Sequence, residues 1–157
     1  MRYVVYDIET KSTANLKLVG SHIYTCDPTT DVWCVSYCIV TDGERGSITR
    51  WLPTDPVPAD IVAVAADPDT LIVAFNDGFD RQIEQQILHP RYGWPIFAIG
   101  RRRCAQAISL THALPAALDS VAAALRLPVR KTAAGKRAMK TARPAAQAAQ
   151  RRGPKQD

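Results

Sequence analysis

The stretch Tyr3-Val4-Val5-Tyr6-Asp7-Ile8-Glu9, near the start of the chain, decides how the rest is interpreted. Its β-branched and aromatic residues predict a strand. Residues two apart in a strand share a face, so the carboxylates of Asp7 and Glu9 are expected to project together from the strand end. Adjacent carboxylates repel unless a cation lies between them, and with no Cys or His nearby the oxygen-preferring Mg²⁺ or Mn²⁺ suits the pair. A solvent-exposed strand end explains the same two acids about as well.

The residues that follow predict a hairpin next to this strand. Thr10 to Thr30 is expected to be a polar connection. Val32–Val40 is rich in strand-forming residues and apolar on both faces, which favours a central strand. After a turn at 42–46, Ser47–Leu52 alternates as the partner strand of a hairpin would.

The next segments alternate between helix and strand patterns. Pro58 fits the first turn of a helix over Ala59–Ala66, and Thr70–Phe75 predicts a short buried strand. The apolar stripe of Phe79–Leu88 predicts a helix that His89-Pro90 ends. Two alanine-rich helices are expected last, at Ala105–His112 and Ala116–Arg126. The order predicts an α/β fold in which helices flank a mixed sheet.

Length and composition limit the class of protein. The chain has 157 residues, of which 46% are hydrophobic and 22% charged, so one globular domain is expected and general disorder is excluded. No apolar run is long enough for a membrane span, and the N-terminus lacks a signal-peptide pattern, which predicts a soluble, cytoplasmic protein. The four cysteines, Cys26, Cys34, Cys38 and Cys104, lack a zinc-site spacing and are expected to be buried free thiols.

Charge is distributed unevenly along the chain. Residues 1–90 hold 6 basic and 13 acidic side chains, whereas residues 91–157 hold 14 basic and 2 acidic ones. Such asymmetry is typical of a metal site combined with a polyanion-binding region, although a solvated surface with a basic tail gives the same counts. The sequence divides into a domain at 1–128 and a tail at Val129–Asp157, expected to be mostly disordered or loosely helical and to bind DNA in a salt-dependent way.

A second acidic motif, Asn76-Asp77-Gly78-Phe79-Asp80, joins the predicted strand 70–75 to the next helix. Asn-Asp-Gly is ordinary turn chemistry, and an acid near a helix N-terminus interacts favourably with the helix dipole. The functional alternative is that Asp80 reaches the Asp7/Glu9 pair as another metal ligand. Phe79 would then anchor the helix, and Asn76 could bond a phosphate or sugar.

These motifs resemble those of a known family. Tyr6-Asp7-Ile8-Glu9-Thr10 is similar to the first motif of the DnaQ-like, ribonuclease-H-fold 3′–5′ exonucleases, and Asn76–Asp80 to their second. Further segments resemble the exonuclease region of bacteriophage and prophage family A DNA polymerases: Leu16–Gly20, Asp27–Val32, His89–Pro95, Leu118–Ala122, Leu127-Pro128 and Gly135–Met139. The resemblance runs from Tyr3 to about Pro144. It implies a ribonuclease-H-like sheet with three antiparallel strands plus parallel strands.

The resemblance also implies a mechanism, two-metal hydrolysis of DNA from single-stranded or frayed 3′ ends. In that scheme Asp7 bridges both Mg²⁺ or Mn²⁺ ions, Glu9 holds the first ion and its water, and Asp80 holds the second. The same resemblance assigns Thr10, Asn76 and Phe79 to nucleic-acid binding. A polymerase region absent from this chain is the implied partner.

Two departures from the family pattern matter. Phe75 stands where the second motif usually has His, and the third motif, a Tyr or His followed by an Asp, is missing. We therefore expect a truncated domain that cleaves slowly, with Mn²⁺ the more permissive metal. The alternative is a catalytically inactive nucleic-acid-binding remnant of a phage-type polymerase.

Overall fold

The computed structural model describes residues 1–128 and Thr132, and the fold is a five-stranded sheet with helices. The strands are β1 (Arg2–Lys11), β2 (Asp31–Thr41), β3 (Glu44–Trp51), β4 (Leu71–Ala74) and β5 (Arg102–Cys104), in the order β3-β2-β1-β4-β5. β3, β2 and β1 are antiparallel, whereas β4 and β5 run parallel to β1. The predicted mixed sheet is therefore confirmed. β5, a strand of three residues, was not predicted from the sequence.

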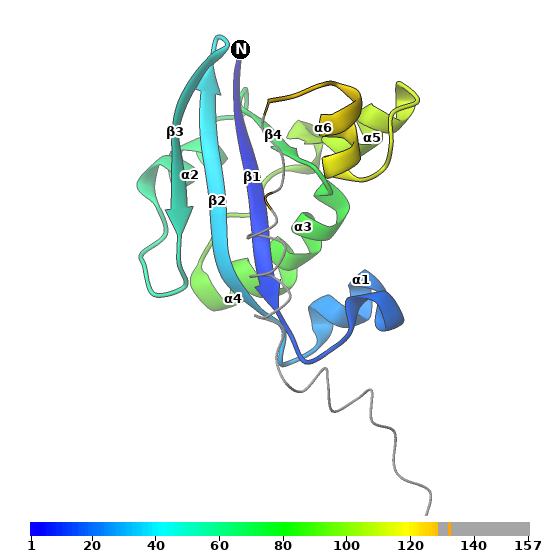
Figure 1. The fold of residues 1–157 in the computed structure, drawn as a ribbon. Helices are drawn as coiled ribbons and strands as arrows, with labels where there is room; N and C mark the ends of the chain where they lie inside the picture. The colour runs from blue at the N-terminus through cyan, green and yellow to red at the C-terminus, as the bar shows by residue number, and fades with distance from the viewer. Residues whose placement is uncertain (129–131, 133–157) are drawn as a thin grey trace, which may run out of the picture.

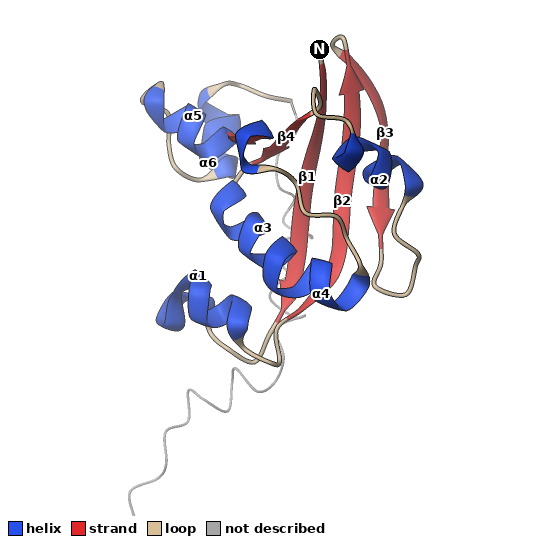
Figure 2. Cartoon of the chain, turned by 180° about the vertical axis from the view of Figure 1, so that it is seen from behind, coloured by secondary structure: helices blue, strands red, loops and turns tan. Residues whose placement is uncertain are grey.

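The helices lie mainly on one side of this sheet. They are α1 (Leu16–Cys26), α2 (Ala59–Ala66), α3 (Asp77–Ile83), the π-helical turn η1 (Glu84–Leu88), α4 (His89–Tyr92), the 3₁₀ turn η2 (Ile99–Arg101), α5 (Ala105–Thr111) and α6 (Leu118–Ala124). Figure 2 shows α2, α3 and α4 in front of the sheet, and Figure 1 shows the opposite face without a described helix across β1, β2 and β3. We call this second side the open face.

The hydrophobic core fills the space between the sheet and α2, α3 and η1. Val4, Tyr6 and Ile8 of β1 point into it and are at most 6% exposed, as alternation along a strand requires. On the helix side, Ile61, Val64, Ile83 and Ile87 are almost completely buried. Trp51 and Trp94 close one end with ring centroids 5.0 Å apart. The core thus leaves the other residues of β1, among them Asp7, on the open face.

The connection between β1 and β2 differs from the prediction. Thr10–Thr30 is not a plain polar connection, because Leu16–Cys26 form α1, which Asn15 caps by accepting from the N–H of Lys17. Gly20 interrupts this helix with φ 76°. A left-handed φ is accessible to Gly at little cost, so a broken helix forms where the composition predicts a loop.

The hairpin and the Pro90 region also differ from expectation. The predicted turn 42–46 is only two residues long: Asp42 and Gly43 both have positive φ, as in type I′ turns, and β3 starts at Glu44. His89-Pro90 does not end the helix that starts at Asp77. Proline cannot donate its i→i−4 hydrogen bond, and the wider π turn η1 precedes it, with the N–H of His89 bonded to the carbonyl of Glu84. The helical path continues to Tyr92 and ends at Gly93, whose φ is 70°.

Two further predictions are corrected or left open. All four cysteines are free, but of them only Cys38 is buried, Cys26 is exposed, and Cys34 and Cys104 are intermediate. Cys26 and Cys104 are the last residues of α1 and β5, where fewer neighbours enclose a side chain, and Cys34 pairs in register with the partly exposed Glu9. The predicted tail 129–157 lies, except for Thr132, outside the described residues. Among the residues that are described, no helix is both long and apolar enough to cross a bilayer.

Candidate functional site

The first part of the candidate site is the end of β1 on the open face. Asp7 is exposed and Glu9 partly exposed, while their neighbours Tyr6 and Ile8 are buried on the other side. On β2 their register partners are Ser36 and Cys34, and the register shifts immediately after Glu9. The sequence prediction that the two carboxylates share a strand face is thus consistent with this alternation.

The second part is Asp80, which comes from α3. β4 pairs with β1 only from Tyr3 to Val5. Within residues 1–128 the rest of this β1 edge has no strand partner, and α3 contacts β1 instead. Figures 1 and 2 both show α3 beside the second half of β1. Asp80 lies in the first turn of α3 and is only 4% exposed.

Electrostatics connect Asp80 with the pair on β1. The pKa of Asp80 is raised to about 8, first because burial disfavours the charged form, and then because the charges of Asp7, Asp77 and Glu9 repel it. The charge of Arg102 acts in the opposite direction. Among the described residues, the structure contains no salt bridge to Asp80. The structure therefore brings Asp7, Glu9 and Asp80 into one electrostatic neighbourhood with an excess of negative charge.

The three residues predicted to bind nucleic acid have different surroundings. The Thr10 hydroxyl is 2.9 Å from the Tyr24 hydroxyl, which joins the end of β1 to α1. Phe79 packs its ring against Tyr24 with the centroids 5.9 Å apart, and it contacts the core. Asn76, at the N-cap of α3, is exposed, and its side chain makes no capping hydrogen bond. Asn76 is thus free to contact a ligand, whereas Thr10 and Phe79 already have partners within the protein.

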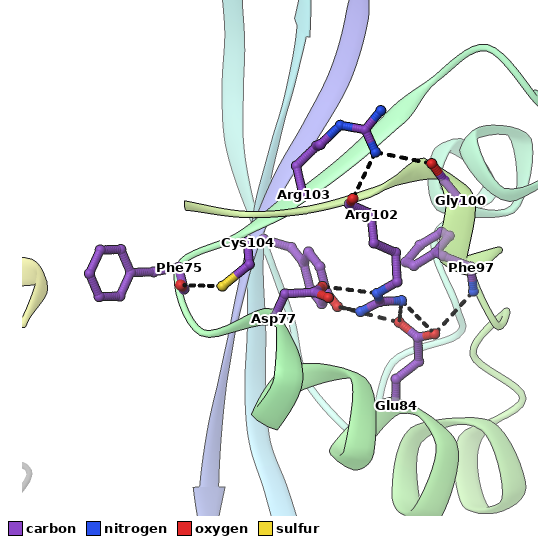
Figure 3. Close-up of polar contacts among 9 residues, drawn as sticks. Phe75, Asp77, Glu84, Phe97, Gly100, Arg102, Arg103 and Cys104 are labelled. Atoms are coloured by element: carbon purple, nitrogen blue, oxygen red, sulfur yellow. Dashed lines mark hydrogen bonds and ion pairs between the residues drawn. The ribbon is translucent and has the colours of Figure 1, made fainter. Parts of the chain in front are cut away.

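Next to Asp80, the structure contains a buried charged cluster that the sequence analysis missed. It consists of Tyr6, Asp77, Glu84 and Arg102, and we call it the Arg102 cluster (Figure 3). The sequence predicts a turn at Asp77 and places Arg102 in the basic segment 91–157. Neither pattern predicts a buried ion pair between them. One residue in the sequence does indicate such a cluster. Glu84 lies between Ile83 and Ile87 on the apolar side of a predicted helix, where an acid needs a buried partner.

The donor chemistry of Asp7, Glu9 and Asp80 fits a hard divalent cation. All three supply carboxylate oxygens, the ligands that Mg²⁺ and Mn²⁺ prefer, and Asp80 is buried against like charges. Within the described part of the chain, however, no three His, Cys, Asp or Glu side chains are arranged so that they could already hold a metal ion. The assignment of these residues as metal ligands therefore stays a prediction.

Comparison with known proteins gives a similar fold and one similar sequence. No family model matches the chain. The sequence is 26% identical to a DNA polymerase of Bacillus phage SP02 over 136 residues, 87% of this chain and 20% of the polymerase, so the chain spans about a fifth of that relative. A solved structure described as the apo form of a nuclease is 16% identical, with a TM-score of 0.52, over 85% of this chain and 56% of that one. This likeness and the strand order agree with the expected ribonuclease-H-like fold, a mixed sheet flanked by helices.

Proposed function

We propose that this chain is a nuclease domain of the DnaQ-like 3′–5′ exonuclease type, which hydrolyses DNA phosphodiesters from the 3′ end with Mg²⁺ or Mn²⁺. The observation that carries the proposal is the buried carboxylate of Asp80, whose pKa the charges of Asp7 and Glu9 help to raise to about 8. The cost of burying a carboxylate among like charges is expected to be offset by a ligand, and a divalent cation is the chemically suitable one. The similar phage DNA polymerase supports DNA as the substrate.

Each residue of the site has a distinct part in the proposal. Asp7, Glu9 and Asp80 would hold the metal ions, with Asp7 contributing to both. When bound, such ions would lower the pKa of a water molecule and offset negative charge on the leaving 3′ oxygen. Asn76 is exposed one turn before Asp80 and is placed to donate a hydrogen bond to a phosphate or sugar oxygen. Thr10 and Phe79 support the substrate end of the site through Tyr24.

The open face supplies the route for a DNA strand. Asp7 is exposed there, and so are Val5 at 42% and Ile48 at 69%. Arg50 of β3 is exposed opposite Ser36, the register partner of Asp7. A basic side chain two strands away from the acidic site can neutralise a backbone phosphate while the 3′ end lies at the carboxylates. A cytoplasmic location is part of the same proposal.

Digestion of end-labelled single-stranded DNA tests the function. With 3′-labelled DNA and Mn²⁺ we expect slow release of labelled mononucleotides, slower still with Mg²⁺, because the 157 residues contain no third exonuclease motif. The variant Asp7→Asn is expected to be about a hundred- to a thousandfold slower. Asp69→Asn, a matched change at an exposed acid after α2, should leave the rate unchanged. 5′-labelled DNA distinguishes 3′–5′ degradation from internal cleavage.

The alternative is a nucleic-acid-binding remnant without catalysis. It predicts that DNA binds and is not cleaved with either metal, and that Asp7→Asn binds as well as the parent chain. Deleting residues 129–157 should then lower DNA affinity at low salt, since that segment holds nine basic residues. Cleavage at equal rates by the parent chain and Asp7→Asn would contradict the proposed site.

A further inference from the structure

The guanidinium of Arg102 is the centre of the Arg102 cluster. Its Nε donates to Asp77 Oδ1 at 2.9 Å, and its Nη1 lies 3.0 Å from both carboxylate oxygens of Glu84. Its Nη2 donates to the Tyr6 hydroxyl. The side chains of Arg102 and Glu84 are 2% and 0% exposed. Figure 3 shows the guanidinium between Asp77 and Glu84. Glu84 also accepts from the main-chain N–H of Phe97 at 3.0 Å and from the Tyr6 hydroxyl at 3.4 Å.

The partners of Arg102 lie directly beside the proposed metal ligands in the chain. Tyr6 precedes Asp7 on β1, so the two side chains point to opposite faces of the same strand segment. Asp77 and Glu84 are three residues before and four residues after Asp80, spacings that share one helix face. Arg102 on β5 therefore bonds to Tyr6, the residue before Asp7 on β1, and to helical residues on both sides of Asp80 in sequence.

Among the described residues, no strand pairs with the β1 edge beside α3. The β1–β4 ladder ends at Val5 and Val73, and the residues of β1 beyond it lie beside a helix. A helix against a strand edge is held by side chains alone. The bonds from Arg102 to Tyr6, Asp77 and Glu84 are directional and buried, and a planar guanidinium satisfies carboxylates in a fixed geometry. Together they connect β1 and β5 to the helical segment that carries Asp80.

We propose that Arg102 is a positioning residue for the acidic site: it holds α3, which carries Asp80, against β1, which carries Asp7 and Glu9. Arg102 itself contacts neither DNA nor metal in this scheme, because its donor groups are occupied inside the core. The inference rests on the proposed function, since it gives Arg102 a role only if the three acids bind a cation.

The test is the Mn²⁺ affinity of the full chain, measured by the electron paramagnetic resonance signal of free Mn²⁺. Arg102→Lys keeps the positive charge but loses the planar guanidinium, whose N–H groups donate to Tyr6, Asp77 and Glu84. It is expected to weaken Mn²⁺ binding about ten- to a hundredfold, the range typical of residues that support metal ligands. Tyr6→Phe removes a single hydroxyl, folds more readily, and should weaken binding by about threefold on the same reasoning.

Arg101→Lys is the matched control. Arg101 is the neighbouring residue and also binds through several N–H groups, but to the carbonyls of Val64, Ala65, Asp67 and Thr70 around the end of α2. Replacing the Arg101 guanidinium by an ammonium group should remove some of these hydrogen bonds and lower the melting temperature without changing the affinity for Mn²⁺. A purely structural role for Arg102 would make affinity follow melting temperature in both lysine variants, and it would overturn the inference.

The outcomes separate this inference from the proposed function. If the parent chain binds Mn²⁺ in a manner that depends on Asp7 and Asp80, and Arg102→Lys and Tyr6→Phe bind it equally well, the positioning role is wrong and the proposed site stands. If the parent chain itself binds no Mn²⁺, the proposed function is wrong and the inference falls with it. Weakening in both cluster variants with the Arg101→Lys control unchanged supports both.

Discussion

Three buried acids follow one another along the helical segment 77–88, and two of them have a basic partner whereas the third has acidic neighbours. Asp77 and Glu84 are buried and paired with Arg102, whereas Asp80, between them in sequence, is also buried, and the charges of Asp7, Asp77 and Glu9 help to raise its pKa. The paired acids are satisfied within the protein. Asp80 has a surplus of negative charge around it, which in the proposed function a cation from solution would balance. Residue type and burial alone do not reveal which acid is structural.

Removing the guanidinium of Arg102, the partner of Asp77 and Glu84, has the largest expected effect on the free energy of unfolding. Arg102→Met leaves Asp77 and Glu84 buried without their partner, and it should lower the free energy of unfolding by about 3–5 kcal/mol. Urea denaturation followed by tryptophan fluorescence measures it, since Trp51 and Trp94 are in the core. A midpoint equal to that of the parent chain would mean that the cluster contributes nothing to folding.

Neutralising the unpaired acid should have the opposite sign. Asp80 has a pKa of about 8 in the folded state and 3.8 as its ordinary value. Without metal, the folded protein keeps a proton that the unfolded chain has lost, so stability falls as pH rises from about 4 towards 8. Asp80→Asn should remove this dependence and be more stable than the parent by about 2–3 kcal/mol at pH 8.5 in EDTA, with a smaller gain at pH 5. A loss of stability at pH 8.5 would show that Asp80 is paired.

A change of one hydrogen-bonding group in the paired set should be milder. Tyr6→Phe removes the hydroxyl that receives from Arg102 and lies 3.4 Å from Glu84 Oε2. The expected cost is about 1–2 kcal/mol in the free energy of unfolding. Chemical denaturation at pH 7 measures it, and a cost as large as that of Arg102→Met would mean that the ring position, rather than the hydroxyl, matters.

The smallest change in the free energy of unfolding is expected from an exposed ion pair, and it serves as a reference for the buried pairs. Arg2 and Asp67 approach to 3.4 Å with both side chains about a third exposed, and Asp67 also accepts from Thr70. Arg2→Ala should change the free energy of unfolding by no more than about 0.5 kcal/mol. If it changed stability as much as Tyr6→Phe does, charge pairing rather than burial would explain the paired set.

The sequence was sufficient for the elements that follow simple periodicity. β1, the β2–β3 hairpin, α2 and the mixed sheet follow from alternation, turn residues and helix spacing. α1 was missed because Gly20 breaks its pattern, and β5 because a strand of three residues with two arginines lacks the usual composition. Of the site, Asp7, Glu9 and Asp80 were named from motifs. The Arg102 cluster was not, because its partners are up to 96 residues apart and only the fold brings them together.

Thermal unfolding with and without Mn²⁺ most directly tests the claim that Asp7, Glu9 and Asp80 together bind a divalent cation. A ligand that binds only the folded state raises its stability by about 2.7 kcal/mol when present at a hundred times its dissociation constant. The parent chain at pH 7.5 should therefore melt several degrees higher in millimolar Mn²⁺, whereas Asp80→Asn and Asp7→Asn should show little or no shift. An equal shift in all three proteins, or none in the parent chain, would contradict the claim.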